Sequence, residues 1–363
     1  MIDVYAPGIS SCFGDLDSTL SALHEGRRGT RSLADIAGFD VPGVAVVYAD
    51  PDIEETYELR AAAHLRRALG QTLASLRSPK QHRTAAVVCT GLGSTPGDEA
   101  RASNVSWVSA EQVVRDELGP DVDTFSITNA CSASGTGLAI GADLLAGGRY
   151  DQVLVAAADS MTRAMLTMIG KVAAEPAAYC APFDARQTGA VLGEGAATCV
   201  LVPTDVPDGP ERFGSVRAIE CSSDAGHPTA PDARVITRTV LQAISHAGVT
   251  ANDVDFVIPH GTGTTLNDEC ETSVYSQIPD LVRQACFLPL KGGIGHTSGA
   301  SFLMSVLTAM AICRGMPSPV YVPEQSADAP RLRWQPTPEW DPNLALVCAY
   351  GFGGANAVGV IAA

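Results

Sequence analysis

Cys131 lies at a junction that suits a nucleophile. The preceding Val122–Ile127 alternates apolar and polar residues as a strand does, and Leu138–Leu145 is apolar with glycine and alanine spacing, as in a buried helix. A cysteine at such a junction meets unpaired backbone N–H groups and the positive end of the helix dipole, which predicts a lowered thiol pKa and a reactive thiolate. The alternative is a buried and inert thiol, because free cysteine is among the most buried residue types.

Two histidines and a lysine occur in glycine-rich loops that follow apolar strands. His260 lies in VIPHGTGT, Lys291 and His296 lie in KGGIGHTSGA, and the glycine turn AYGFGGAN holds Phe352. Active sites of α/β proteins gather where strand ends meet loops. We therefore expect these loops to lie beside Cys131.

A thiolate with two imidazoles suits acyl-thioester transfer. The thiolate attacks a thioester and forms an acyl-enzyme. Neutral imidazole N–H groups stabilise the negative charge that develops on the carbonyl oxygen of a second thioester. This charge develops when a malonyl group loses CO2 and becomes an enolate. The enolate then attacks the acyl-enzyme. A Cys-His protease would leave the second histidine and the lysine unexplained.

A zinc centre is the other chemistry that histidine-rich loops suggest. His260 and His296 could be joined by the carboxylates of Asp268 and Glu271, which follow the first histidine on a predicted helix. The ammonium of Lys291 would be a poor neighbour for a bound cation. We therefore expect no metal.

Composition and charge exclude several classes of function. The chain has 363 residues, a formal net charge of −16, and ten scattered cysteines without a CxxC pair. Such acidity argues against nucleic acid and anionic membrane surfaces as partners. MIDVYAPG is not a secretory signal, and no apolar run approaches the length of a membrane helix, so a cytoplasmic protein with free thiols is expected. Thr90–Gly93 lacks the third glycine of a dinucleotide loop.

Strand-like and helix-like stretches alternate along both parts of the chain, which predicts a layered α/β architecture. The Pro- and Asp-rich segment Thr204–Glu211 is the best internal boundary. In the first part the strands are expected at Ile2–Pro7, Arg83–Gly91, Val122–Ile127 and Asp151–Ala158, with a glycine-broken strand pair over Ala190–Val202. Helices are expected there at Leu16–Leu23, Tyr57–Leu76, Val105–Glu117 and Leu138–Leu145. In the second part the strands are expected at Phe213–Cys221, Val254–Pro259, Cys286–Leu290, Leu344–Ala349 and Val358–Ile361, with helices at Ala233–Ala247, Leu266–Tyr275 and Gly299–Arg314.

Taken together, these segments resemble the β-ketoacyl-acyl-carrier-protein synthases of types I and II, which are members of the thiolase fold. NACSASGTGLAIGADLLAGG is similar to the family's nucleophile segment, HGTGTTLNDECET to its first histidine motif, LKGGIGHTSGA to its lysine and second-histidine motif, and YGFGGAN to its C-terminal glycine turn. APFDARQTGAVLGEGAA and the opening through EGRRG also fit, so the resemblance spans nearly the whole chain in the family's order.

The resemblance assigns roles to these residues. Cys131 is the nucleophile, and His260, His296 and Lys291 complete the catalytic set. Glu271 is the carboxylate that the family pairs with the lysine. The backbone N–H groups of Cys131 and Phe352 form the oxyanion hole, with Gly351 and Gly353 supporting the turn. The resemblance implies no cofactor.

It also implies the architecture and the partners. Two similar halves, 1–205 with the nucleophile and 206–363 with both histidines and the lysine, give αβαβα layers with mixed central sheets. The expected reaction is decarboxylative condensation between an acyl group on Cys131 and malonyl-acyl carrier protein, in fatty acid or specialised polyketide synthesis. A homodimer is expected, and a heterodimer with a related subunit stays open.

Several features separate this chain from relatives of the family. Initiating synthases and chalcone-type enzymes carry Asn where this chain has His296, degradative thiolases carry a second Cys where it has Phe352, and chain-length-factor partners lack Cys131. The segment between Gly93 and Cys131 looks short, and Thr265 and Ala190 replace a usual Pro and a usual aromatic residue. The short segment favours specialised polyketide synthesis, and the two replacements are expected to reshape the acyl pocket. Acyl transfer without decarboxylation and a non-catalytic subunit stay as alternatives.

An acidic chain needs a local basic patch to bind an acidic carrier protein. The helix predicted over Tyr57–Leu76 has one apolar face, and Arg60, Arg66 and Arg67 are placed largely on its other side. We expect these arginines to contact the carrier protein. The alternative is a solvated helix face without a partner.

Overall fold

The computed structural model describes residues 1–55, 59–74, 82–92, 109–172, 176–186, 189–204, 211–224, 226–324 and 332–363. Within these ranges, ten strands form one sheet in the order β10-β9-β11-β12-β8-β1-β7-β6-β4-β5. The strands are β1 (Ile2–Ser10), β4 (Thr84–Thr90), β5 (Asp123–Thr128), β6 (Gln152–Asp159), β7 (Gly195–Pro203), β8 (Gly214–Ser223), β9 (Phe256–Ile258), β10 (Cys286–Phe287), β11 (Leu344–Tyr350) and β12 (Ala355–Ala362).

The sheet is built from the same pattern twice. The first part runs β1-β7-β6-β4-β5 and the second runs β8-β12-β11-β9-β10. In each, the first three strands are antiparallel neighbours and the last three are parallel neighbours. The two parts join where β1 pairs with β8 antiparallel. This repetition supports two similar halves, while the division at 205/206 lies outside the described residues and stays a prediction.

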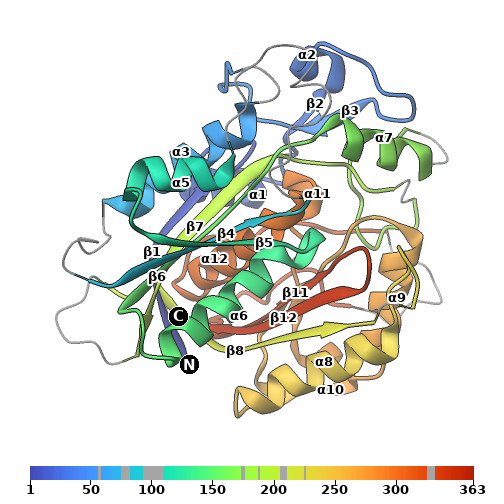
Figure 1. The fold of residues 1–363 in the computed structure, drawn as a ribbon. Helices are drawn as coiled ribbons and strands as arrows, with labels where there is room; N and C mark the ends of the chain where they lie inside the picture. The colour runs from blue at the N-terminus through green and yellow to red at the C-terminus, as the bar shows by residue number, and fades with distance from the viewer. Residues whose placement is uncertain are drawn as a thin grey trace.

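The helices form layers around and between these parts of the sheet (Figure 1). Helices α6 and α12 contact each other in the middle layer, with α6 on β4 and β6 and α12 on β11 and β12. Helices α3 and α5 cover β1, β4, β6 and β7, and α8 covers β8 and β12 with α9 beside it. The bounds are α3 (Arg60–Leu73), α5 (Ala110–Leu118), α6 (Ala133–Ala146), α8 (Ala233–His246), α9 (Thr265–Ser276) and α12 (Ser301–Cys313). The expected five-layer α/β architecture with mixed strand directions is confirmed.

Most of the expected strands and helices are present, with ends shifted by a few residues. Parts of several predicted segments lie outside the described residues. They are 57–58 and 75–76 of the helix predicted over Tyr57–Leu76, 105–108 of the helix predicted over Val105–Glu117, residue 93 of the Thr90–Gly93 loop, and 205–210 of the predicted boundary. The glycine-broken strand pair expected over Ala190–Val202 is one strand, β7, preceded by isolated bridges. The short elements β2 (Thr30–Ser32), α2 (Leu33–Ala37), β3 (Val46–Tyr48) and α10 (Pro279–Gln284) were not expected from the sequence. The helix expected at Leu16–Leu23 is α1 (Leu16–His24), and the helical spacing of the methionines over Met161–Met168 corresponds in part to α7 (Arg163–Val172).

Small residues allow α6 to lie between the two halves of the sheet. A Cβ added at Gly135 would lie 2.4 Å from the Cβ of Ala357 on β12, and one added at Gly137 would lie 2.3 Å from Sγ of Cys89 on β4. Side chains at these positions would therefore force the helix away from one sheet or the other. The close fit holds the N-terminal end of α6, and with it Cys131, at a defined depth between the layers.

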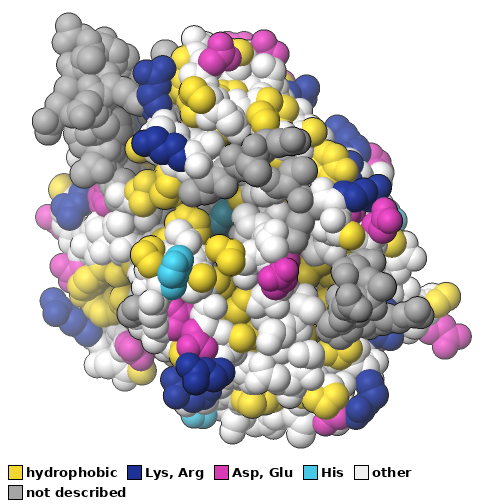
Figure 2. Space-filling model, turned by 90° about the vertical axis from the view of Figure 1, so that its right-hand side faces the viewer, with side chains coloured by type: hydrophobic (Ala, Val, Ile, Leu, Met, Phe, Trp, Pro, Cys, Tyr) yellow, Lys and Arg dark blue, Asp and Glu magenta, His cyan; other side chains and the backbone are white. Residues whose placement is uncertain are grey.

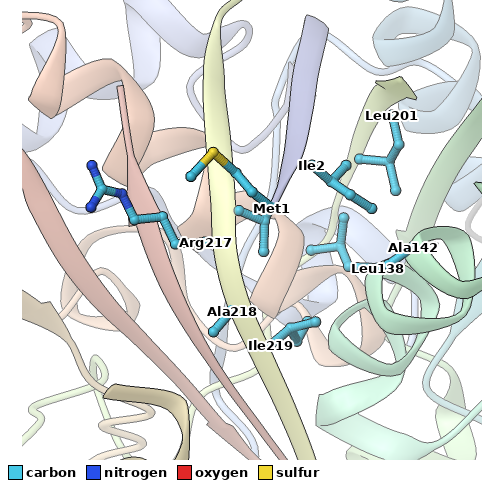
Figure 3. A pocket seen from close by; sticks show the side chains of 9 residues that line it. Met1, Ile2, Leu138, Ala142, Leu201, Arg217, Ala218 and Ile219 are labelled. Carbon is cyan, nitrogen blue, oxygen red and sulfur yellow. The ribbon is translucent and has the colours of Figure 1, made fainter. Parts of the chain in front are cut away.

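Two further features of the structure bear on function. Among the described residues, no helix is both long and apolar enough to cross a membrane. A cavity between α6 and the strands β1, β7 and β8 is lined mainly by apolar side chains, among them Met1, Ile2, Leu138 and Ile219 (Figure 3). None of the predicted catalytic residues lines this cavity.

Candidate active site

The nucleophile segment turns sharply between β5 and α6. After Thr128 ends β5, Ala130 adopts φ +48°, a left-handed conformation that residues with a side chain rarely adopt. A 3-10 turn over Ala130–Ser132 then leads into α6, and Cys131 lies in that turn, half-buried. The predicted position of Cys131 between a strand and a buried helix is confirmed.

The structure brings Cys131 together with both predicted histidines. Its Sγ lies 2.9 Å from Nε2 of His296. Ligand-type atoms of Cys131, His260 and His296 all lie within 4.8 Å of one another, and the two imidazole rings meet edge to face with centroids 5.3 Å apart. One sulfur and two imidazoles therefore face a single shared space.

Hydrogen bonds fix the backbone N–H, the backbone carbonyl and one ring nitrogen of His296. Its N–H donates to the carbonyl of Val191, its carbonyl accepts from the N–H of Gly193, and its Nδ1 accepts from the N–H of Ser298 at 3.2 Å. Because Nδ1 accepts a hydrogen bond, the proton of the neutral ring is on Nε2. Nε2–H therefore points at the sulfur as a donor.

Lys291 places a hydrogen-bond donor at Nδ1 of His260, as Ser298 does at Nδ1 of His296. It opens the short helix α11 (Lys291–Ile294), is buried, and its Nζ donates to the carbonyl of His260 and lies 3.4 Å from Nδ1 of the same residue. An ammonium can only donate, so Nδ1 of His260 accepts and its Nε2 carries the proton. Both imidazoles thus present an N–H group from Nε2.

Glu271 supports the His260 loop and also acts on Lys291 through its charge, which raises the pKa of the ammonium against the effect of burial. Its pairing with Lys291, which the resemblance implied, stays a prediction. Among the described residues, no ion pair joins Glu271 to Lys291. The carboxylate instead accepts from the backbone N–H groups of His260 at 2.9 Å and Gly261 at 2.6 Å, and from the side chains of Asn267 and Tyr275. The two residues are also linked through the backbone of His260, because Lys291 donates to its carbonyl and Glu271 accepts from its N–H.

The charge state of the site follows mainly from burial. Burial raises the pKa of the Cys131 thiol to about 11, against the opposing effects of the Lys291 ammonium and of backbone N–H groups. The predicted lowering of the thiol pKa is therefore wrong, because removal from water outweighs the helix end and the lysine. Burial and the nearby Lys291 lower the pKa of His260 and of His296 well below the usual value, so both rings are neutral. Burial also lowers the pKa of Lys291.

The C-terminal glycine turn completes the surroundings of the sulfur. The backbone N–H groups of Phe352 and of Cys131 itself both stabilise the thiolate. Gly351 leaves room for this, since a Cβ there would lie 3.2 Å from the Cβ of Ala130. The N–H of Gly353 donates to the carbonyl of Pro228, which fixes the far side of the turn. The two amides expected at an oxyanion hole are therefore both directed at the sulfur.

The β11–β12 turn and α9 lie on the same side of the molecule (Figure 1). This side faces the viewer in Figure 2, which shows hydrophobic, acidic and histidine side chains next to one another in the middle of this face. The Phe352 side chain is 43% exposed and that of Leu266, at the start of α9, is 55% exposed.

The donor set does not fit a metal ion. Cys131, His260 and His296 are close enough together to bind one. A metal-binding imidazole usually donates its second ring N–H to an acceptor. Here the second nitrogen of each ring faces a donor, Ser298 N–H in one case and Lys291 Nζ in the other. Asp268 accepts from the N–H of Phe183 instead of joining the histidines.

The arginines predicted to contact a carrier protein differ in exposure. Arg60 is 3% exposed, and its guanidinium donates to Glu194 and to the carbonyls of Asp50 and Ile53, so the prediction that it lies on the exposed face is wrong. Arg67 is partly exposed and pairs with Asp50 at 2.8 Å, whereas Arg66 is exposed. Only Arg66 and Arg67 remain as candidates for a docking surface.

The sequence analysis overlooked Asp159. This residue is buried at the end of β6, and its Oδ2 accepts hydrogen bonds from the backbone N–H groups of Gly91 and Gly299. The signal was visible as an acidic residue that closes the apolar run DQVLVAAAD. A carboxylate at the end of a buried strand must be hydrogen-bonded, which marks it as a residue that holds neighbouring loops.

Comparison with known proteins agrees with this geometry. Residues 113–206 match the model of the beta-ketoacyl synthase N-terminal domain, and residues 213–320 match that of the beta-ketoacyl synthase C-terminal domain. The chain belongs to the beta-ketoacyl synthase family. Its fold matches the structure of the ishigamide ketosynthase/chain length factor with a TM-score of 0.84 and 25% identity, over 99% of this chain and 98% of that one.

Two curated relatives are similar at the level of sequence. Nodulation protein E of Rhizobium meliloti is 30% identical over 249 residues, which cover 66% of this chain and 62% of that protein. The tetracenomycin polyketide synthase ketoacyl synthase alpha subunit of Streptomyces glaucescens is 30% identical over 273 residues, which cover 68% of this chain and 61% of that protein. The matched region thus spans about three-fifths of the length of these relatives.

Proposed function

We propose that this protein is a ketosynthase that condenses an acyl group on Cys131 with a malonyl group on acyl carrier protein. The observation that carries the proposal is the 2.9 Å contact between Sγ of Cys131 and Nε2 of His296, with a ring nitrogen of His260 within 4.8 Å of the groups of both residues. A nucleophile beside two neutral hydrogen-bond donors meets the needs of both half-reactions.

In the first half-reaction the Cys131 sulfur attacks the acyl thioester and a new carbon–sulfur bond forms. The bond between the acyl carbon and the carrier sulfur breaks, and the departing carrier sulfur takes up the proton that Cys131 gives up, so the carrier leaves as a thiol. The thiol is neutral at rest because burial raises its pKa to about 11. The Lys291 ammonium, the Phe352 N–H and Nε2–H of His296 stabilise the thiolate as it forms. The backbone N–H groups of Cys131 and Phe352 then stabilise the oxyanion of the tetrahedral intermediate.

In the second half-reaction a malonyl thioester loses CO2. The electron pair of the broken carbon–carbon bond stays with the thioester, which becomes an enolate. The carbonyl oxygen that takes the charge accepts from Nε2–H of His260 and of His296, which are neutral and therefore keep their protons. The enolate carbon attacks the acyl carbonyl, a carbon–carbon bond forms, and Cys131 leaves as the thiolate. Lys291 keeps His260 in the donor tautomer throughout.

The test is to incubate the protein with acyl- and malonyl-carrier protein and to follow CO2 release and the mass of the carrier-bound product. We expect equal amounts of CO2 and a chain extended by two carbons. A protein that becomes acylated at Cys131 but releases no CO2 from malonyl-carrier protein would contradict the proposal.

Transfer of the acyl group to an alcohol or amine is the second candidate function, because it uses the same acyl-enzyme and oxyanion donors. It leaves the paired Nε2–H donors of His260 and His296 without a shared task, and for that reason we favour condensation. The same assay without malonyl-carrier protein, and with alcohols or amines added, distinguishes the two reactions. A third interpretation, a non-catalytic subunit, predicts that Cys131→Ala leaves the output of the pathway unchanged.

The partner that we infer is a second copy of this chain or a related subunit. Strand β5 lies at the end of the sheet and pairs with β4 alone among the described strands, and its Phe125 and Ile127 are half-buried. Such an edge offers free backbone groups to another strand. The structural relative described as a ketosynthase/chain length factor supports a paired assembly. Light scattering on the purified chain would separate a monomer from a dimer.

We place this chemistry in specialised polyketide synthesis and in the cytoplasm. The polyketide synthase subunit from Streptomyces glaucescens supports the first inference. The free cysteines of the structure, several of them fully buried, suit a reducing compartment and support the second.

A further inference from the structure

Asp159 joins two loops that are far apart in the sequence. The residue ends β6, is 9% exposed, and its Oδ2 accepts from the N–H of Gly91 at 2.8 Å and from the N–H of Gly299 at 2.6 Å. The Ser298 side chain also hydrogen-bonds the carboxylate. One oxygen atom thus holds the end of β4 and the turn that precedes α12.

Each of these loops supports one of the two groups in contact at the active site. The carbonyl of Gly91 accepts from the N–H of Ala130, the residue before Cys131. On the other side, the N–H of Ser298, the residue before Gly299, donates to Nδ1 of His296. The carboxylate is therefore connected by short hydrogen-bonded paths to the nucleophile turn and to the imidazole.

The packing at this junction admits only glycine at two positions. A Cβ added at Gly299 would lie 2.5 Å from the nitrogen of Gly91 and 2.8 Å from Oδ2 of Asp159. One added at Gly91 would lie 2.0 Å from Oγ of Ser298. The absence of both side chains lets the two amides reach the same oxygen.

Two residues held by these contacts, Ala130 and Ser298, adopt unfavourable backbone conformations. Ala130 has φ +48° and Ser298 has φ +47°, and each is adjacent to, or hydrogen-bonded with, a group of the active site. Such conformations persist only where the surrounding structure holds them. The hydrogen bonds that converge on Asp159 supply that constraint on both turns.

We propose that Asp159 is a positioning residue, which holds the Cys131 turn and the His296 turn at the separation that lets Nε2 of His296 reach the sulfur. The catalytic importance of this separation rests on the proposed function. The separation itself can be measured without turnover, through the reactivity of the thiol.

Two variants separate the position of the loops from the charge of the carboxylate. The negative charge of Asp159 raises the pKa of the Cys131 thiol, whereas the Lys291 ammonium lowers it. Asp159→Asn removes the charge and keeps an oxygen that accepts both amide hydrogens. Asp159→Ala removes the charge and the acceptor. The difference between the two variants therefore reports on position alone.

The experiment measures the rate of alkylation of Cys131 by iodoacetamide as a function of pH, with the modified peptide identified by mass. Wild type, Asp159→Asn and Asp159→Ala are compared, each with His296 intact and with His296→Ala. We expect Asp159→Ala to react about tenfold more slowly than Asp159→Asn at neutral pH, as loss of one hydrogen bond to a thiolate predicts. We expect this difference to disappear with His296→Ala.

Asp151 provides the matched control, because it precedes the other end of β6 and also accepts from a backbone N–H, that of Arg83. Asp151→Ala should leave the alkylation profile unchanged. Equal rates for folded Asp159→Asn and Asp159→Ala, or a difference that persists in full without the imidazole of His296, would overturn the inference. Circular dichroism and thermal melting establish which variants are folded.

The outcome is independent of the proposed reaction. If the alkylation rates follow the expected pattern and no condensation product forms, the positioning role stands and the proposed function fails. If condensation occurs and Asp159→Ala keeps both the kcat and the alkylation rate of Asp159→Asn, the positioning role fails and the function stands.

Discussion

The sulfur of Cys131 lies 2.9 Å from Nε2 of His296, although the two residues are 165 positions apart in the chain. The contact is directional, because the N–H of Ser298 occupies Nδ1 and leaves the proton on Nε2. Nε2–H of His296 is therefore a donor toward the sulfur, and the ring has no free nitrogen lone pair to accept the thiol proton. Several predictions about variants depend on this assignment.

Replacement of Cys131 by alanine removes the site of acyl attachment. We expect no acyl-enzyme and a fall in condensation of at least about a thousandfold, because the covalent route is lost. Mass spectrometry of the intact protein after incubation with acyl-carrier protein measures the adduct. A stable adduct on Cys131→Ala of the same mass as on wild type would place the nucleophile elsewhere. Cys180→Ala, which removes a buried cysteine, is the control and should keep the adduct.

The two histidines should differ in their effects on the half-reactions. His260→Ala should slow decarboxylation of malonyl-carrier protein by about a hundredfold or more, the loss usual for one oxyanion donor, with a smaller effect on acylation. His296→Ala should slow both, since only His296 contacts the sulfur. Acylation and CO2 release are measured separately. Equal losses in acylation for both variants would contradict the assignment.

Lys291 should control the pH at which Cys131 reacts. Its ammonium lowers the pKa of the thiol, so Lys291→Met should raise that pKa further above its ordinary value. The alkylation profile should then move to higher pH, with a slower rate at neutral pH. Lys171 on α7 is an exposed lysine, and Lys171→Met serves as the control. A profile that moves to lower pH in Lys291→Met would show that the lysine does not act as a nearby cation.

Burial raises the pKa of Asp159 and that of Asp268, each to about 7. Between about pH 4 and about pH 7 the folded protein therefore holds protons that the unfolded chain releases, and the free energy of unfolding falls as the pH rises through this range. Asp159→Asn and Asp268→Asn should each reduce that slope, as urea titrations at a series of pH values would show. A slope as steep in the double variant as in wild type would contradict the assignment.

Arg60 and Arg66 lie on the same helix but should have different roles. Arg60→Ala leaves the buried Glu194 without its guanidinium partner and should lower the free energy of unfolding by about 3–5 kcal/mol. Arg66→Glu should leave stability nearly unchanged and weaken carrier-protein binding, since its charge is exposed. Urea denaturation and binding titrations at low salt measure the two effects. Unchanged carrier affinity in Arg66→Glu combined with Arg67→Glu would remove this helix face as a docking surface.

The sequence by itself determined which residues could react and the local structure around them. Periodicity and glycine content placed Cys131 between a strand and a helix and placed His260, Lys291 and His296 in loops after apolar strands, because these signals depend on neighbours along the chain. The order of strands and helices followed from the same signals. Short strands such as β3 (Val46–Tyr48) could not be predicted in this way, because three residues carry almost no periodic pattern.

Only the tertiary structure decided which groups meet and how strongly water is excluded from them. The pKa of the Cys131 thiol is raised where a fall was expected, and Arg60 is buried against Glu194. Glu271 and Lys291 both hydrogen-bond the backbone of His260. The tertiary structure also brought Gly91 and Gly299 to one oxygen of Asp159. Desolvation and long-range contacts depend on the packing of all layers together, and no local stretch of sequence contains that information.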